Sequence, residues 1–304
     1  MKQTNTFREH FGIRTRHVEF IDIPMDEDLL AFICPFLIAN NRQDPRIDTI
    51  YGQMESFLKY LNRNFIMTND KVNGMKFLSH LHEPNEYHLG YSDSNKGKAM
   101  AKERSKSVFD SLRRNRFAQQ GLSITNEAHN VLLLVEGIGQ DIMSDVISNV
   151  CRNVFAQFTE EQCIKHSIQT YPTQIEYYND NTGQWATTTY NLPEYKGKRI
   201  ILIPNEIVAG HRMYSTYYNW FVSSNYIAVD LMKKSKTDDD ANDKTMRLLK
   251  DGSKKAVIKE IYRVYRKPKH DLIDFVLKYR GSLDEFLVYA KEHYPALDLD
   301  NLDI

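Results

Sequence analysis

The chain has 304 residues, and its 40 basic and 40 acidic side chains give a formal net charge of zero. This balance excludes a polycationic tail protein and a uniformly acidic, solvating chain. Hydrophobic residues make up 41% of the sequence and aromatic residues 12%, which is enough for a buried core in one large domain or two smaller ones.

The predicted elements mix strands and helices without a repeating βαβ unit. Apolar side chains at helical spacing indicate helices, and short apolar or alternating runs indicate strands. In chain order we predict a strand at 17–23, a helix at 49–65, a helix with a basic face at 96–119, a strand at 131–135, a helix at 142–155, a hairpin at 174–190, a strand at 199–204, and helices at 254–265, 271–279 and 283–293. The fold class that we expect is α+β, with a mixed-sheet core, packed helices and a small C-terminal helical subdomain.

A charged segment divides the sequence near its C-terminal end. Residues 233–245 consist mostly of lysine and aspartate and have the composition of a flexible loop. We therefore expect a core domain at 1–232 and a helical subdomain at 246–304. The last predicted helix begins with Ser282 and Glu285, which have the spacing of a capping box.

Cysteine usage and hydropathy indicate the compartment. The longest apolar run, residues 29–39, is interrupted by Pro35 and is shorter than the roughly 20 residues that cross a bilayer. The three cysteines, Cys34, Cys151 and Cys163, form no CxxC pair, which is typical of a reducing compartment. We expect a cytoplasmic protein with no membrane partner, and Cys151 in the core.

The neutral net charge hides two basic segments. Residues 96–116 carry eight basic and two acidic side chains, and residues 233–269 carry thirteen basic and six acidic ones. These segments form one phosphate-binding surface if the fold brings them together, and otherwise they are two solvated helix faces. The candidate nucleic-acid-binding residues are Arg104, Arg113, Arg114, Lys254 and Lys255.

The most distinctive motif is the turn between the predicted strand at 131–135 and the next helix. Its glycines permit tight geometry, and Asp141 and Asp145 are four residues apart on one helix face. Together with Glu136, and with Glu86 from a separate segment, they are candidate ligands for Mg²⁺ or Mn²⁺, which prefer carboxylate oxygen. The alternative is structural, with Asp141 as a helix cap and Asp145 interacting with the helix dipole.

Weaker patterns offer other chemistry. The strand-ending Glu136 also resembles the start of a toprim site, but no Asp-x-Asp follows a second strand. Residues 80–88 contain three histidines and two glutamates without the spacing of a known zinc motif. Glu194 and Lys196 match half of a nuclease motif outside a strand.

Four stretches together resemble a family of uncharacterised bacterial proteins of unknown activity. They are residues 21–35, 83–92, 135–150 and 199–208, and the GIGxDxxSD pattern here is Gly137–Asp145. The chain departs from the pattern at Cys34, where the family has Asp, and at Asn205, where it has Lys. If either position is catalytic in relatives, activity is altered here. The resemblance implies a place among bacterial mobile or defence genes.

The leading hypothesis is a nucleic-acid-acting protein, specifically a Mg²⁺-dependent nuclease or phosphodiesterase in antiviral defence. Glu86, Glu136, Asp141 and Asp145 would be catalytic, and the last three would hold the metal. The alternatives are a non-catalytic adaptor subunit that binds a protein partner or forms a homo-oligomer, and a nucleotide-binding sensor that uses the glycine turn.

Overall fold

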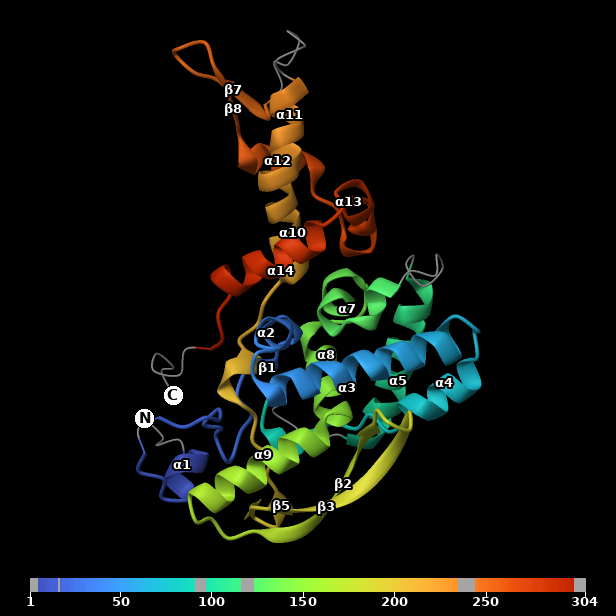
Figure 1. Ribbon diagram of the computed structural model, residues 1–304, viewed down its shortest axis with the longest axis vertical. Helices are drawn as coiled ribbons and strands as arrows, with labels where there is room; N and C mark the ends of the chain where they lie inside the picture. Colours follow the sequence, from blue (N-terminus) through green and yellow to red (C-terminus); the bar gives the residue numbers. More distant parts are fainter. Residues whose placement is uncertain (1–4, 16, 91–96, 116–122, 235–243, 298–304) are drawn as a thin grey trace.

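The chain forms a largely helical body and an extension that leaves one end of it (Figure 1). This computed structural model describes residues 5–15, 17–90, 97–115, 123–234 and 244–297, and only the backbone of residues 97–104. We call residues 5–213 the body and residues 214–297 the extension. No helix in the described ranges is long and apolar enough to cross a membrane.

The body contains most of the helices. Its elements in order are α1 (Phe7–His10), β1 (Phe32–Ile33), α2 (Pro35–Asn40), α3 (Pro45–Leu61), the π-turn η1 (Asn62–Ile66), α4 (Lys71–Leu78), the 3₁₀ turn η2 (Asn85–Tyr87), α5 (Gly97–Arg114), η3 (Ser123–Asn126), α7 (Ala128–Leu134), α8 (Gln140–Val150), α9 (Arg152–Lys165), β2 (Tyr171–Asn179), β3 (Gln184–Leu192), β4 (Glu194–Tyr195), β5 (Lys198–Arg199), η4 (Asn205–Ile207) and β6 (Val208–Ala209).

Helix α3 lies at the centre of the body and packs against α2, α7, α8 and α9. It begins at Asp44, whose side chain accepts hydrogen bonds from the amides of Arg46 and Ile47, and Pro45 fixes its first turn. Its predicted apolar stripe is buried, with Ile50 and Phe57 fully enclosed. The helix predicted at 49–65 is therefore confirmed, and it begins four residues earlier.

The helix predicted at 142–155 is two helices. α8 ends at Val150, the backbone of Cys151 leaves the helical region, and α9 begins at Arg152. The apolar stripe continues across the break, so periodicity alone does not reveal it, and Cys151 is buried as expected. The break changes the direction of the chain between Asn149 and Arg152.

The strands of the described residues form four separate antiparallel pairs, β1–β6, β2–β3, β4–β5 and β7–β8, in place of one mixed sheet. The predicted hairpin is confirmed as β2–β3, with Tyr178 opposite Trp185. Helices thus form most of the core, and the fold class is α+β as predicted.

The strands predicted at 131–135 and 17–23 are not found, and of the strand predicted at 199–204 only residue 199 lies in a strand, β5. Residues 131–135 belong mainly to α7, which is buried on every side among other helices, and a short apolar run fits such a helix as well as a strand. Residues 17–23 and 200–204 are extended but form no ladder. They meet at one isolated antiparallel bridge, Phe20 opposite Pro204. Other amides bond to separate acceptors, such as Ile201 to the carbonyl of Glu86 and Leu202 to the hydroxyl of Thr159.

The extension begins with a long helical rod that projects from the body (Figure 1). The elements of the extension are α10 (Tyr214–Val222), the π-helix η5 (Ser223–Ile227), α11 (Ala228–Lys234), β7 (Met246–Leu248), β8 (Lys254–Ala256), α12 (Ile258–Tyr265), the 3₁₀ helix η6 (Lys269–Asp271), α13 (Ile273–Lys278) and α14 (Ser282–His293). The expectation of helices alone beyond residue 245 is wrong, because β7 and β8 form a hairpin. α14 packs against α2, and η6 packs against α7, so the chain returns to the body.

The predicted capping box at the start of α14 is also wrong. Gly281 is the N-cap, with a positive φ of 84°, and no side chain caps the helix. The hydroxyl of Ser282 instead lies 2.6 Å from the hydroxyl of Tyr218. The charged loop predicted at 233–245 falls mostly on residues 235–243, outside the described residues, and the predicted domain boundary stays a prediction.

Candidate functional site

The four predicted carboxylates do not assemble into a metal site. Asp141 and Asp145 lie on α8 four residues apart, as predicted, and both are half-buried. Glu136 is exposed in the turn before α8, where its Oε2 lies 3.3 Å from Nδ1 of His270. Among the described residues, no group of three or more His, Cys, Asp or Glu could hold a metal ion. The Mg²⁺ or Mn²⁺ predicted from the sequence therefore has no fitting ligand set in this part of the chain.

Glu86 instead lies in a buried charged cluster. Its Oε1 is 3.1 Å from Nε of Arg152 and 3.4 Å from Nη2 of Arg199, and the side chains of Glu86 and Arg152 are 10% and 5% exposed. Arg152 also donates to Oδ1 of Asn149 at 2.6 Å. Burial opposes the charge of Arg152, but the neighbouring Glu86 and Tyr87 outweigh it and raise the pKa of Arg152. The cluster fastens the segment around Glu86 to α8 and α9.

The histidines near Glu86 have structural partners too. His80 Nδ1 lies 2.9 Å from Oε1 of Glu176, and its ring stacks on Trp185 at 5.0 Å. The backbone of His82 is held by Asn149, which accepts from its amide at 3.1 Å and donates to its carbonyl at 2.8 Å. Burial and the charge of Arg152 lower the pKa of His82. These contacts attach the irregular segment to the β2–β3 hairpin and to α8.

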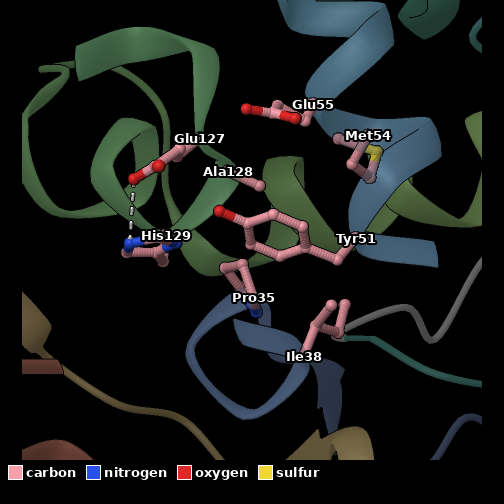
Figure 2. Close-up of a pocket in the computed structure, with 8 residues that line it drawn as sticks. All are labelled: Pro35, Ile38, Tyr51, Met54, Glu55, Glu127, Ala128 and His129. Carbon is pink, nitrogen blue, oxygen red and sulfur yellow. Dashed lines mark ion pairs between the residues drawn. The ribbon is translucent and has the colours of Figure 1, made fainter. Parts of the chain in front are cut away.

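A small cavity lies between α2, α3 and the start of α7 (Figure 2). The figure shows the ring of Tyr51 at its centre, with Glu127 and His129 on one side, and Nε2 of His129 lies 3.3 Å from Oε2 of Glu127. Burial lowers the pKa of His129 to about 4, so the ring is neutral at pH 7. Burial also raises the pKa of Glu127, and burial with the Glu127 charge raises that of Tyr51 to about 12. The cavity volume is about 10 Å³, room for one water molecule and for no substrate.

The two basic segments approach each other where the extension returns to the body. Arg114, at the end of α5, and His270, in η6, line the same hollow together with Glu136 and Gly137. Lys269 donates to the carbonyl of Ile138 at 2.7 Å, and burial lowers the pKa of this lysine to about 8. Of the other predicted basic residues of α5, Arg113 donates to Asn69, and the side chain of Arg104 lies outside the described residues.

The hairpin β7–β8 and α12 form an exposed basic arm, which we define as residues 245–267. Its exposed basic side chains point into solvent along both elements and are Arg247, Lys250, Lys255, Lys259, Arg263 and Arg266. Within the arm only Asp251 and Glu260 are acidic. Glu260 pairs with Arg263 at 3.2 Å, and no carboxylate of the described residues lies within ion-pair distance of Arg247, Lys255 or Lys259. Of the two lysines predicted to bind nucleic acid, Lys255 is exposed and Lys254 is half-buried.

Aromatic rings accompany this charge. Trp220 of α10 is 43% exposed and lies 5.4 Å from the ring of Tyr262 in α12. Tyr265, at the end of α12, is 37% exposed. The guanidinium of Arg266 lies 5.9 Å from the ring of Tyr262. The arm thus combines unpaired positive charge with accessible aromatic faces.

The two positions that depart from the expected family pattern have structural partners. Cys34 is fully buried at the start of α2, its Sγ lies 3.0 Å from the hydroxyl of Tyr214, and burial raises the pKa of its thiol. Asn205 donates to the carbonyl of Val18 at 3.1 Å. Each contact joins two parts of the fold, Cys34 at the start of α2 to Tyr214 of α10 and Asn205 of η4 to the segment at Val18.

Sequence patterns did not single out Arg152, His129 or Lys269. Arg152 follows an apolar stripe and looks like a surface charge, and His129 precedes a run predicted as a strand. Lys269 is one of many lysines in its segment. Only three-dimensional burial distinguishes these three from their neighbours.

Comparison with known proteins identifies a family. The family model that is described as a domain of unknown function (DUF8370) matches residues 12–215. The chain belongs to this family. The match ends at the start of α10, so the basic arm lies beyond it. No curated protein and no solved structure matches the chain. An uncharacterised family was expected, while the role of Gly137–Asp145 as its signature stays a prediction.

Proposed function

We propose that the protein binds nucleic acid through its basic arm, mainly by contacts to the phosphate backbone. The single observation that carries this proposal is the arm itself, where eight basic residues and only two acidic ones lie between residues 245 and 267. The rest of the chain is correspondingly acidic, because the net charge is zero. A cluster of lysine and arginine on one projecting element attracts a polyanion and keeps the acidic remainder away from it.

The side chains fit a backbone reader. Lys259, Arg263 and Arg266 lie on one face of α12 and its end, at spacings of four and three residues. The hairpin adds Arg247 and Lys255 on neighbouring strands. Contacts of this kind release condensed counterions and are insensitive to base sequence.

The aromatic rings favour single-stranded nucleic acid over duplex. Unpaired bases stack on exposed aromatic faces, and Trp220 and Tyr265 offer such faces beside the charge. Each stacked base contributes about 1 to 3 kcal/mol in proteins of this kind. We therefore expect tighter binding of a single strand than of a duplex of equal length.

The proposal is limited to binding. Metal-dependent cleavage needs a cluster of metal-binding side chains, and the described residues form no such cluster of three or more His, Cys, Asp or Glu. The nuclease activity, the adaptor role and the defence context stay predictions from the sequence.

The test is fluorescence anisotropy with a labelled single strand of about 16 nucleotides, which is the upper limit of the site covered by a single OB fold. The arm variant carries Arg247→Glu, Lys255→Glu and Lys259→Glu. The matched control carries Lys59→Glu, Lys165→Glu and Lys198→Glu, three exposed lysines of the body with the same total charge change. We expect the arm variant to bind at least about tenfold more weakly and the control to stay close to wild type. Equal losses in both variants would show that net charge alone governs binding, and no binding by the wild type would refute the proposal.

A further inference from the structure

A second feature, separate from the arm, is the hollow where the extension meets the body. It is lined by Ser111, Arg114 and Asn115 of α5 and its end, by Leu134, Glu136 and Gly137, and by His270 of η6. Its volume is about 240 Å³, slightly below the usual range of about 300 to 1,000 Å³ for small-molecule sites. The hollow therefore has room for a compact ligand, whereas the cavity beside Tyr51 has room for one water molecule only.

The lining offers several hydrogen-bond donors to an anion. Arg114 presents a guanidinium, and Ser111 and Asn115 present a hydroxyl and an amide. The guanidinium fork matches the geometry of phosphate oxygens and binds them in pairs. Arg114 is exposed, so its guanidinium is accessible to an anion from solvent.

The lining also contains one strong acceptor, the carboxylate of Glu136. The carboxylate of Glu136 lies 3.3 Å from His270 Nδ1, and His270 Nε2 lies 3.5 Å from Oδ2 of Asp271. Lys269, which precedes His270, donates from its Nζ to the carbonyl of Ile138. A ligand that contacts both Arg114 and Glu136 therefore needs an anionic group for the first and an N–H or O–H donor for the second.

The backbone of the turn is shaped to keep this space open. Gly137 has a positive φ of 85°, and a Cβ at this position would lie 2.4 Å from Oγ of Ser111. Lys269 holds the turn in place from the extension. A side chain at residue 137 would thus displace Ser111 and reduce the hollow.

We propose that this hollow binds one nucleoside monophosphate, with the phosphate on Arg114 and Ser111 and the base or ribose donors on Glu136. A nucleotide has both the anion and the N–H and O–H donors that these lining residues can bind. The site lies between the family domain and the extension, whose His270 also lines it. The inference does not depend on nucleic-acid binding by the arm.

The test is isothermal titration calorimetry of the full chain with AMP, GMP, CMP and UMP, and with inorganic phosphate and uncharged nucleosides as partial ligands. We expect at least one monophosphate to bind more tightly than phosphate or its nucleoside. Arg114→Ala should weaken that binding at least about tenfold, because it removes a charged bidentate donor. Arg113→Ala is the matched control, since this neighbouring exposed arginine contacts Asn69 and does not line the hollow.

Glu136→Gln separates the two ends of the ligand. It should weaken binding of the nucleotide while leaving the affinity for inorganic phosphate unchanged or higher. Binding of no monophosphate, equal losses in the Arg113 and Arg114 variants, or no gain of nucleotide over phosphate would each overturn the proposal. The arm variant should bind the nucleotide like wild type, so failure of one proposal is distinguishable from failure of the other.

Discussion

Replacing His129 should remove a large part of the acid sensitivity of this protein. His129 is 5% exposed, and burial lowers its pKa from 6.5 to about 4. As the pH falls below 6.5, the unfolded chain takes up a proton at this residue while the folded chain does not. The free energy of unfolding therefore falls with decreasing pH over this interval.

The size of the effect follows from the shift. Each pKa unit corresponds to about 1.4 kcal/mol, so His129 alone removes about 3 kcal/mol of stability between pH 6.5 and pH 4. Glu127 acts in the opposite direction, because its raised pKa makes the folded chain take up a proton before the unfolded one. The observed loss should therefore be somewhat smaller than 3 kcal/mol.

The assay is urea unfolding followed by circular dichroism at several pH values from about 7 to about 4. His129→Gln cannot titrate, so its free energy of unfolding should change less with pH than that of wild type, whatever its stability at pH 7. His293→Gln, at an exposed histidine, is the control for the loss of an imidazole from the protein surface. If His129→Gln loses stability as steeply as wild type, the buried neutral state of His129 is not the cause of the acid sensitivity.

Two further changes test the local structure. Glu86→Gln leaves the buried charge of Arg152 without its carboxylate and should cost about 3 to 5 kcal/mol in urea unfolding, whereas Lys165→Ala at an exposed ion pair should cost less than about 1 kcal/mol. A loss below 1 kcal/mol for Glu86→Gln would contradict the buried pair. Gly137→Ala should cost about 1 to 3 kcal/mol by thermal unfolding, because of its positive φ and the contact with Ser111. Adding Ser111→Gly should recover part of this loss, and full recovery would mean that φ contributes nothing.

The sequence predicted helices best where they have one apolar face. α3 and the β2–β3 hairpin carry clear periodic patterns and were predicted near their observed positions. The run at 131–135 has no such periodicity because α7 is buried on all sides, so helix and strand look alike there. The break at Cys151 was not predicted because the same stripe serves both helices.

The candidate sites were less predictable, since they depend on contacts between distant segments. Glu86 was singled out as a catalytic carboxylate, but its role depends on Arg152 and Arg199, which lie 66 and 113 residues further along the chain. The basic character of the arm was visible from composition, whereas its separation from the body was not. The approach of Arg114 and His270 likewise requires the return of the extension to α7.

The salt dependence of nucleic-acid binding tests the central proposal most directly. The affinity of the wild type for a single strand should fall linearly with salt on logarithmic axes between about 50 and about 200 mM, as phosphate contacts require. The arm variant should show a slope smaller by about 2, because each of the three replaced cations contributes about 0.7 on a single strand, while the body control keeps the wild-type slope. An arm variant with the wild-type slope, or binding that does not respond to salt, would contradict the assignment of the arm as the nucleic-acid-binding surface.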